Sequence, residues 1–168
     1  MPPDIDLYAL TKHRDRETIE MFLNSYVDRG VSEDREDEEL MMLPLDQEPG
    51  DKSFEDYDWE PAKSLSNIVR RGLDYPRRSF TVYLTPNQAG IDRVILSFSS
   101  DNQVVLGLSI DDEEESSENV VIAKELLLNL MEKYNCHLGL ITVEQPAPVN
   151  EEAFRNQMKS PYTIYFHD

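Results

Sequence analysis

The fold is decided by the stretch VILSFSSDNQVVLGLSI, residues 94–110, in which two alternating apolar runs flank a polar turn. The apolar positions of the two runs are Val94, Leu96, Phe98, Val104, Leu106, Leu108 and Ile110. A period of two is typical of strands with one buried face, and the turn at 99–102 predicts that the strands form a β-hairpin. The opposite face carries Ser97, Val105, Gly107 and Ser109. These side chains are small enough either to meet solvent or to let another element approach closely.

The flanking segments extend this hairpin into a larger sheet. Residues 80–84 alternate in the same way, and residues 138–143 have the apolar run of a buried strand. Residues 162–166 alternate again and predict an edge strand. The apolar face of that strand is formed by Tyr162, Ile164 and Phe166. Residues 5–10 are interpreted as a short strand or an extended lead-in.

The strongest helical pattern covers residues 118–134, where apolar side chains occupy much of the circumference. Such a helix is expected to pack centrally on one face of the sheet. Shorter helices are predicted from about Asp15 to Arg29, with Gly30 as the C-cap, and from Pro61 to about residue 72. A third short helix follows Asn150 as its N-cap.

These patterns predict the fold class. We expect one α+β domain over residues 1–168, with an antiparallel or mixed sheet of about four to six strands. The helix at about 118–134 is expected to pack on one face of this sheet, with two or three shorter helices around it. At 168 residues the chain is long enough to bury a real core without disulfides or metals.

Two short segments carry almost all of the net charge of −18. Residues 33–60 hold thirteen acids and two bases, and residues 111–118 hold six acids and no base, so the remaining chain is nearly neutral. Part of the second run has a local explanation, because acids before a helix N-terminus are stabilised by the helix dipole. Localised acidity on a balanced fold indicates a directed field or a contact surface.

Residues 31–60 are predicted to be an acidic, partly mobile insertion in the domain. An apolar island at 40–45 is expected to dock on the core as a brief strand or tether. The candidate partner-binding residues are the acids and aromatics Glu36, Asp37, Glu38, Glu39, Asp56, Tyr57, Asp58, Trp59 and Glu60. Aromatic rings flanked by carboxylates suit a hot spot for arginine or lysine. The alternative is a solvated acidic loop with Trp59 buried beneath it.

No motif in the chain predicts catalysis or metal binding. Cys136 and His137 are adjacent, and on a strand adjacent side chains point to opposite faces, so we interpret Cys136 as a packed apolar residue. The three histidines lack a spacing that would form a metal face, and the run at 111–115 lacks the glycine of a calcium loop. We therefore expect no catalytic residue, no metal and no cofactor.

The composition also bounds the partners and the setting. Strong negative charge disfavours nucleic acid and anionic membranes, because both are polyanions. The first residues lack the basic and apolar regions of a signal peptide, and Cys136 stands alone, so no intramolecular disulfide can form. We expect a cytoplasmic protein with a basic protein as its partner.

The leading hypothesis is a non-enzymatic acidic binding protein that engages a basic protein, in its most concrete version an inhibitor or a bacterial toxin-immunity protein. In general character the composition is similar to that of small acidic bacterial immunity proteins. The first alternative is a regulatory or interaction module that forms a homo-oligomer through an open sheet edge. The second alternative is a carboxylate-dependent enzyme, which a cluster of desolvated carboxylates in a cleft would support.

Overall fold

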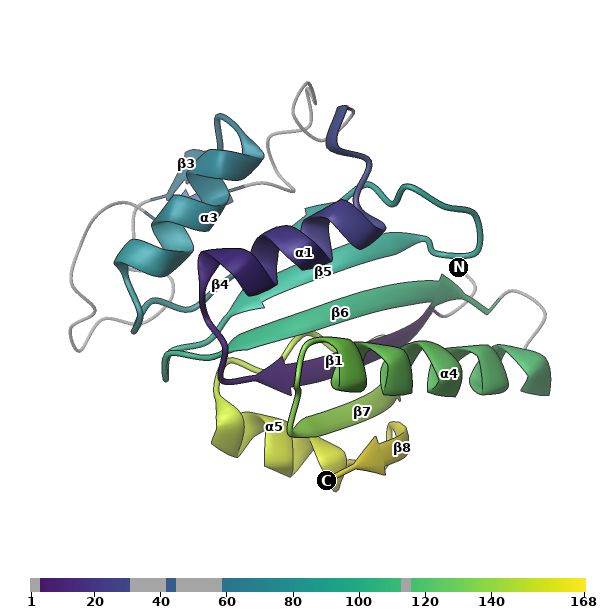
Figure 1. Ribbon diagram of the computed structural model, residues 1–168. Coiled ribbons are helices and arrows are strands. Elements are labelled where there is room, and N and C mark those ends of the chain that lie inside the picture. The colour runs from purple at the N-terminus through teal and green to yellow at the C-terminus, as the bar shows by residue number, and fades with distance from the viewer. Residues whose placement is uncertain (1–3, 31–41, 45–58, 113–115) are drawn as a thin grey trace.

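The computed structural model describes residues 4–30, 42–44, 59–112 and 116–168 (Figure 1). Six strands form one antiparallel sheet in the order β4-β5-β6-β1-β7-β8. They are β1 (Asp4–Thr11), β4 (Phe80–Leu84), β5 (Arg93–Phe98), β6 (Val104–Asp111), β7 (Leu138–Val143) and β8 (Thr163–His167). The predicted hairpin at 94–110 is β5 and β6, and the predicted α+β class is confirmed, with every pairing of this sheet antiparallel.

The lead-in segment at the N-terminus is the central strand of the sheet. β1 pairs with β6 on one side and with β7 on the other. Its odd positions, such as Leu7, belong to the main core, whereas Tyr8 and Leu10 belong to a second cluster on the opposite face. Burial on both faces explains why the run IDLYAL at residues 5–10 is almost continuously apolar, since a central strand has no solvent side.

Three helices cover one face of the sheet (Figure 1). They are α1 (Arg16–Tyr26), α3 (Leu65–Asp74) and α4 (Ser117–Lys133). The principal helix, α4, lies against β1 and β7 and buries Ala123, Leu127 and Leu130. Its bounds match the predicted 118–134 within one residue, because Ser116 caps it by accepting a hydrogen bond from the Glu118 backbone N–H at 3.2 Å.

A fourth helix, α5 (Glu151–Met158), packs on the opposite face, which we call the α5 face. Its Phe154 and Met158 contact a smaller core of buried residues that includes Tyr8, Leu10 and Leu140. Because α5 is only eight residues long, it covers one end of this face. The other end, at the start of β1, carries the polar residues described below.

Two predicted helix boundaries differ from the structure. α1 ends at Tyr26 rather than near Arg29, because Val27 turns into an extended conformation and forms a bridge with Pro86, so Gly30 is not its C-cap. Pro61 does not open a helix. It belongs to β3 (Trp59–Pro61), which pairs with β2 (Met42–Pro44), and α3 begins four residues later after Ser64 as its N-cap.

The edge strand β8 was predicted with the wrong face buried. Tyr165 packs against the main core and lies under Lys124 of α4, whose ammonium is 5.0 Å from the ring centroid. Ile164 and Phe166 are 46% and 56% exposed. The reason is the register with β7, which pairs Tyr165 with Ile141 of the main core and Phe166 with Leu140 on the opposite face.

Candidate functional site

The uncovered end of the α5 face brings acids and small polar side chains together. Asp4, Asp6 and Tyr8 occupy alternate positions of β1, so all three point to this face. The register pairs Asp6 with Ser109 and Tyr8 with Gly107 of β6. The row of small residues recognised in the sequence therefore lies beside the two aspartates of the central strand.

These residues line a cavity of about 550 Å³, which we call the Asp6 cavity. Its lining consists of Asp4, Asp6, Tyr8, Tyr83, Asp92, Arg93, Ile95, Ser109, Asp111, Glu144, Gln145 and Pro146. They come from the starts of β1 and β5, the end of β6, the strand β4 and the segment after β7. The antiparallel order of the sheet places these strand ends at the same edge, which no spacing along the chain would reveal.

Tyr8 forms the floor of the cavity, and its ring packs against Gly107 of β6. A Cβ atom at Gly107 would lie 2.8 Å from Cδ1 of Tyr8 and 3.1 Å from Cβ of Ile95, so the Tyr8 ring occupies the space that a side chain would need. The Tyr8 hydroxyl donates a hydrogen bond of 2.5 Å to the Gln145 carbonyl oxygen. Burial raises the pKa of this hydroxyl, which keeps it protonated and fixed as a donor.

Asp6 is the most buried carboxyl of the cavity, with 7% of its surface exposed. Burial raises its pKa to about 6, and the hydroxyl of Ser109, which donates a hydrogen bond of 2.8 Å to Oδ1, offsets part of that effect. Burial and the charge of Asp92 also raise the pKa of Asp4. Both shifts mean that negative charge at these positions is destabilised in the folded protein.

The charges around the cavity are unequal. Among the described residues that line it, five are carboxylates and Arg93 is the one cation, and the Arg93 guanidinium lies over the Tyr83 ring at 5.5 Å from the centroid. One guanidinium cannot neutralise five carboxylates. At neutral pH the cavity therefore carries a net negative charge in surroundings that are partly desolvated.

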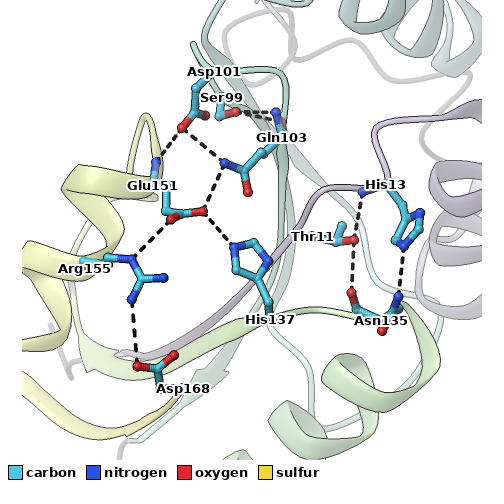
Figure 2. A network of polar contacts seen from close by, with 10 residues as sticks. All are labelled: Thr11, His13, Ser99, Asp101, Gln103, Asn135, His137, Glu151, Arg155 and Asp168. Carbon is cyan, nitrogen blue, oxygen red and sulfur yellow. Dashed lines mark hydrogen bonds and ion pairs between the residues drawn. The ribbon is translucent and has the colours of Figure 1, made fainter.

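A second polar cluster lies at the opposite end of the α5 face (Figure 2). Glu151, the first residue of α5, accepts hydrogen bonds from His137 at 2.8 Å, from Arg155 at 3.2 Å and from Gln103 at 3.3 Å. Its backbone N–H donates to Asp101 at 2.9 Å. We call these five residues the Glu151 network. The hydrogen bond from His137, followed by those from Arg155 and Gln103, lowers the pKa of Glu151 to about 2.

The Glu151 network joins elements of the fold. Figure 2 shows His137, at the start of β7, and Gln103, at the β5–β6 turn, directed toward the Glu151 carboxylate at the start of α5. This carboxylate is engaged by three donors from the protein itself. The network therefore fastens α5 to the sheet, and its charge is satisfied internally.

Cys136 and His137 do not form a nucleophile and base. Burial raises the pKa of the Cys136 thiol to about 12, and its sulfur lies 3.7 Å from the Leu130 carbonyl oxygen. His137 instead pairs with Glu151. A protonated thiol that packs against the main core is a poor nucleophile, as the sequence predicted for this residue.

Two of the nine predicted partner-binding residues lie in the part of the chain that the structure describes. Trp59 is half-buried and packs against the main core, and Glu60 accepts a hydrogen bond of 2.5 Å from Arg71. Leu43 is fully buried in the main core, so the described part of the apolar island, Met42–Pro44, docks there as expected, and the rest of the island lies outside the described residues. The other seven, which lie outside the described residues, are Glu36, Asp37, Glu38, Glu39, Asp56, Tyr57 and Asp58. A partner-binding role for all nine stays a prediction.

The sequence alone does not predict the Asp6 cavity, although two of its features are consistent with one. One is the small-residue row that includes Gly107 and Ser109, and the other is an acid, Asp6, within the apolar run of residues 5–10. An acid inside a run that must be buried on both faces is unusual, because a buried carboxylate is costly.

Within residues 4–30, 42–44, 59–112 and 116–168, no group of three or more His, Cys, Asp or Glu side chains is arranged to hold a metal ion. In the same part of the chain no helix is both long and apolar enough to cross a membrane. Comparisons of the chain with protein-family models, with curated proteins and with solved structures found no match.

Proposed function

We propose that this protein is a non-enzymatic binding protein that engages a basic protein partner, and that the Asp6 cavity forms part of the contact. The observation that carries the proposal is the charge of the cavity, whose described lining contains five carboxylates and one guanidinium. Such a field attracts a cationic surface, speeds its association and discriminates against neutral or acidic partners.

The position of the site supports binding. Asp6 and Tyr8 lie on the central strand of the sheet, and Ser109 lies on its neighbour, so the cavity floor is built from rigid elements. A site that is already formed loses little conformational entropy when the partner docks. An inhibitor or toxin-immunity role is the most concrete version, because an enzyme that acts on a polyanion has a basic surface for such a protein to cover.

The predicted surface of Glu36–Glu39 and Asp56–Glu60 belongs to the same proposal, as a second acidic contact. So does a cytoplasmic setting, which fits the single cysteine. Neither nucleic acid nor an anionic membrane is expected as a partner, since both would be repelled.

Affinity capture with matched variants tests the proposal. The cavity variant carries Asp4→Asn, Asp92→Asn and Asp111→Asn, and the control carries the same change of charge at the exposed acids Asp74, Glu125 and Glu132, replaced by Asn, Gln and Gln. We expect wild type and control to retain a basic protein from cell extract at low salt and to release it as salt rises. The cavity variant should lose it. Equal retention by the cavity variant and the control would contradict the proposal.

A carboxylate-dependent enzyme is the second candidate, and the raised pKa of Asp6, to about 6, favours it. A carboxyl with that pKa exchanges protons near neutral pH, as a general acid or base must. Chromogenic glycosides, esters and phosphate esters test this candidate. Turnover that is present in the wild type, absent in Asp6→Asn and retained in Glu125→Gln would replace the binding proposal by an enzymatic one.

A homo-oligomer is the third candidate, and the exposed side chains of β8 favour it. Ile164 and Phe166 lie on an edge strand at 46% and 56% exposure, where a second strand could pair. The net charge of −18 on each copy opposes this association. Native mass measured over a range of protein concentrations decides between a monomer and an oligomer.

A further inference from the structure

The Asp6 cavity has the capacity to take a long cationic side chain. Its volume of about 550 Å³ lies within the range of cavities, about 300–1,000 Å³, that enclose groups as large as small ligands. It opens on the end of the α5 face that α5 leaves uncovered. A side chain from a docked protein can therefore reach the floor without moving an element of the fold.

The floor offers hydrogen-bond acceptors that its own donors do not exhaust. An ionised carboxylate has about four acceptor sites. The Ser109 hydroxyl donates to Asp6 at 2.8 Å and lies 3.3 Å from Oδ2 of Asp4, and the backbone of Gln145 also donates to Asp6. Further donors can still be accepted by both carboxylates, and a planar guanidinium presents five of them in a fixed fork.

The cavity walls favour a guanidinium over an ammonium. Tyr8, Tyr83, Ile95 and Pro146 give the lining an apolar and aromatic component beside the acids. A guanidinium is weakly hydrated and stacks on aromatic rings, whereas an ammonium is strongly hydrated and loses more on entering such surroundings. The protein itself provides an example, since the Arg93 guanidinium lies over Tyr83 at the cavity wall.

We propose that the Asp6 cavity binds an arginine side chain of the basic partner, which enters beside Arg93 and pairs with the carboxylates of Asp4 and Asp6. This inference rests on the proposed function and names the group that the site recognises. The internal guanidinium of Arg93 neutralises part of the cavity charge, and the arginine of the partner neutralises more of it. The aromatic walls and the fixed fork of guanidinium donors select arginine over lysine at this position.

A titration of the full chain followed by amide NMR tests the inference. The probes are N-acetyl-arginine methylamide, the corresponding lysine compound and the corresponding citrulline compound, in which a neutral urea group replaces the guanidinium. We expect the arginine compound to shift the amide signals of Asp6, Gly107 and Ser109. The lysine compound should bind at least about threefold more weakly, and the citrulline compound should leave these signals unmoved.

Variants tie the binding to the cavity. Asp6→Asn should weaken arginine binding about tenfold or more, as expected for the loss of hydrogen bonds to a charged group. Asp4→Asn changes a half-buried neighbouring acid and should also weaken arginine binding. Glu125→Gln, which removes the same charge from the exposed side of α4, should leave it unchanged. The dispersion of the amide signals reports whether each variant is folded.

Two outcomes separate this inference from the proposed function. If capture of the basic protein depends on the cavity acids but arginine and lysine compounds bind equally well, the arginine inference is overturned and the binding proposal stands. If the arginine compound binds selectively at Asp6 while capture ignores the cavity acids, the proposed function is overturned. Signals that shift only outside the cavity would also overturn the inference.

Discussion

The two polar clusters of the α5 face shift the pKa values of their acids in opposite directions. At one end the Glu151 network surrounds a carboxylate with donors from His137, Arg155 and Gln103, and the pKa of Glu151 falls to about 2. At the other end burial dominates, and the pKa of Asp6 rises to about 6. The ionised carboxylate is therefore stabilised by the fold in the first cluster and destabilised in the second.

This difference separates a structural joint from a candidate site. A carboxylate that finds its donors within the chain contributes to stability and has little left to offer a partner. A buried carboxylate among like charges costs stability, and a cationic partner would relieve that cost. The total acidity of the chain is thus less informative than the burial of individual acids in the folded protein.

The largest effect is expected in the pH dependence of stability at Asp6. Its folded-state pKa of about 6 lies above the ordinary value of 3.8, so the stabilisation of its protonated form is present near pH 4 and is lost as pH rises through 6. Asp6→Asn removes the ionisation, so the variant does not lose stability at this position as pH rises. Relative to wild type, the free energy of unfolding of the variant should rise by about 2 kcal/mol between pH 4 and pH 7.5.

Urea unfolding followed by circular dichroism over this pH range provides the measurement. Asp74→Asn, an exposed acid at the end of α3, is the control and should stay parallel to wild type. Parallel curves for Asp6→Asn and wild type would show that Asp6 is not held in an unfavourable state. The contrast between the two clusters would then disappear.

The next largest effect is expected at the cavity floor. In Gly107→Ala the new Cβ atom would lie 2.8 Å from the Tyr8 ring, so the ring must move and its hydrogen bond to Gln145 is strained. We expect a loss of about 1–3 kcal/mol in the free energy of unfolding, as for other overpacked interiors, together with weaker binding of the arginine compound.

Gly30→Ala is the matched control for that substitution, because among the described residues the nearest atom to its Cβ would be Oδ1 of Asp28 at 3.6 Å. Thermal unfolding should place it within about 0.5 kcal/mol of wild type. If Gly107→Ala were equally harmless, the Tyr8 ring would not be held against the sheet, and the cavity floor would be less rigid than its contacts indicate.

The fold was largely predictable from the sequence because its main signals are local. The alternation in residues 94–110 and the apolar helix at 118–134 each identify an element and its buried face. The errors arose where distant contacts decide the local structure. Val27 leaves the helix to bridge Pro86, and the pairing of Tyr165 with Ile141 of the main core turns Ile164 and Phe166 to the exposed face of β8.

The candidate site was not predictable in the same way. Its acids at positions 4, 6, 92, 111 and 144 come from separate segments and meet only when the strand order of the sheet is known. Composition directed attention to residues 33–60, where acids are dense along the chain. Density along the chain does not report desolvation, which depends on burial in the folded protein.

A smaller effect is expected in the Glu151 network. The folded-state pKa of about 2 lies below the ordinary value of 4.5, so the stabilisation by Glu151 is present above pH 4.5 and is lost as pH falls toward 2. Because the side chain is 29% exposed, Glu151→Gln should cost about 1–2 kcal/mol at pH 7 and less at low pH.

Glu152→Gln, at the exposed neighbouring position of α5, is the control for this substitution and should have little effect at either pH. Chemical unfolding at pH 7 and pH 3 measures both variants. A Glu151→Gln protein as stable as wild type at pH 7 would mean that the hydrogen bonds from His137 and Arg155 add nothing to the docking of α5.

The smallest effect is expected at Arg93, the one cation that lines the Asp6 cavity. Its charge lowers the pKa values of Asp4 and Asp6, although burial is the dominant influence on both. Arg93→Gln should therefore raise the pKa of Asp6 slightly, as measured by carboxyl-detected NMR titration. The same variant should bind the arginine compound somewhat more tightly, because the cavity charge is then less neutralised. Weaker binding in Arg93→Gln would instead mean that Arg93 supports the ligand by positioning the Tyr83 ring. Arg93 would then act as part of the cavity wall and would not compete with the ligand for the carboxylates.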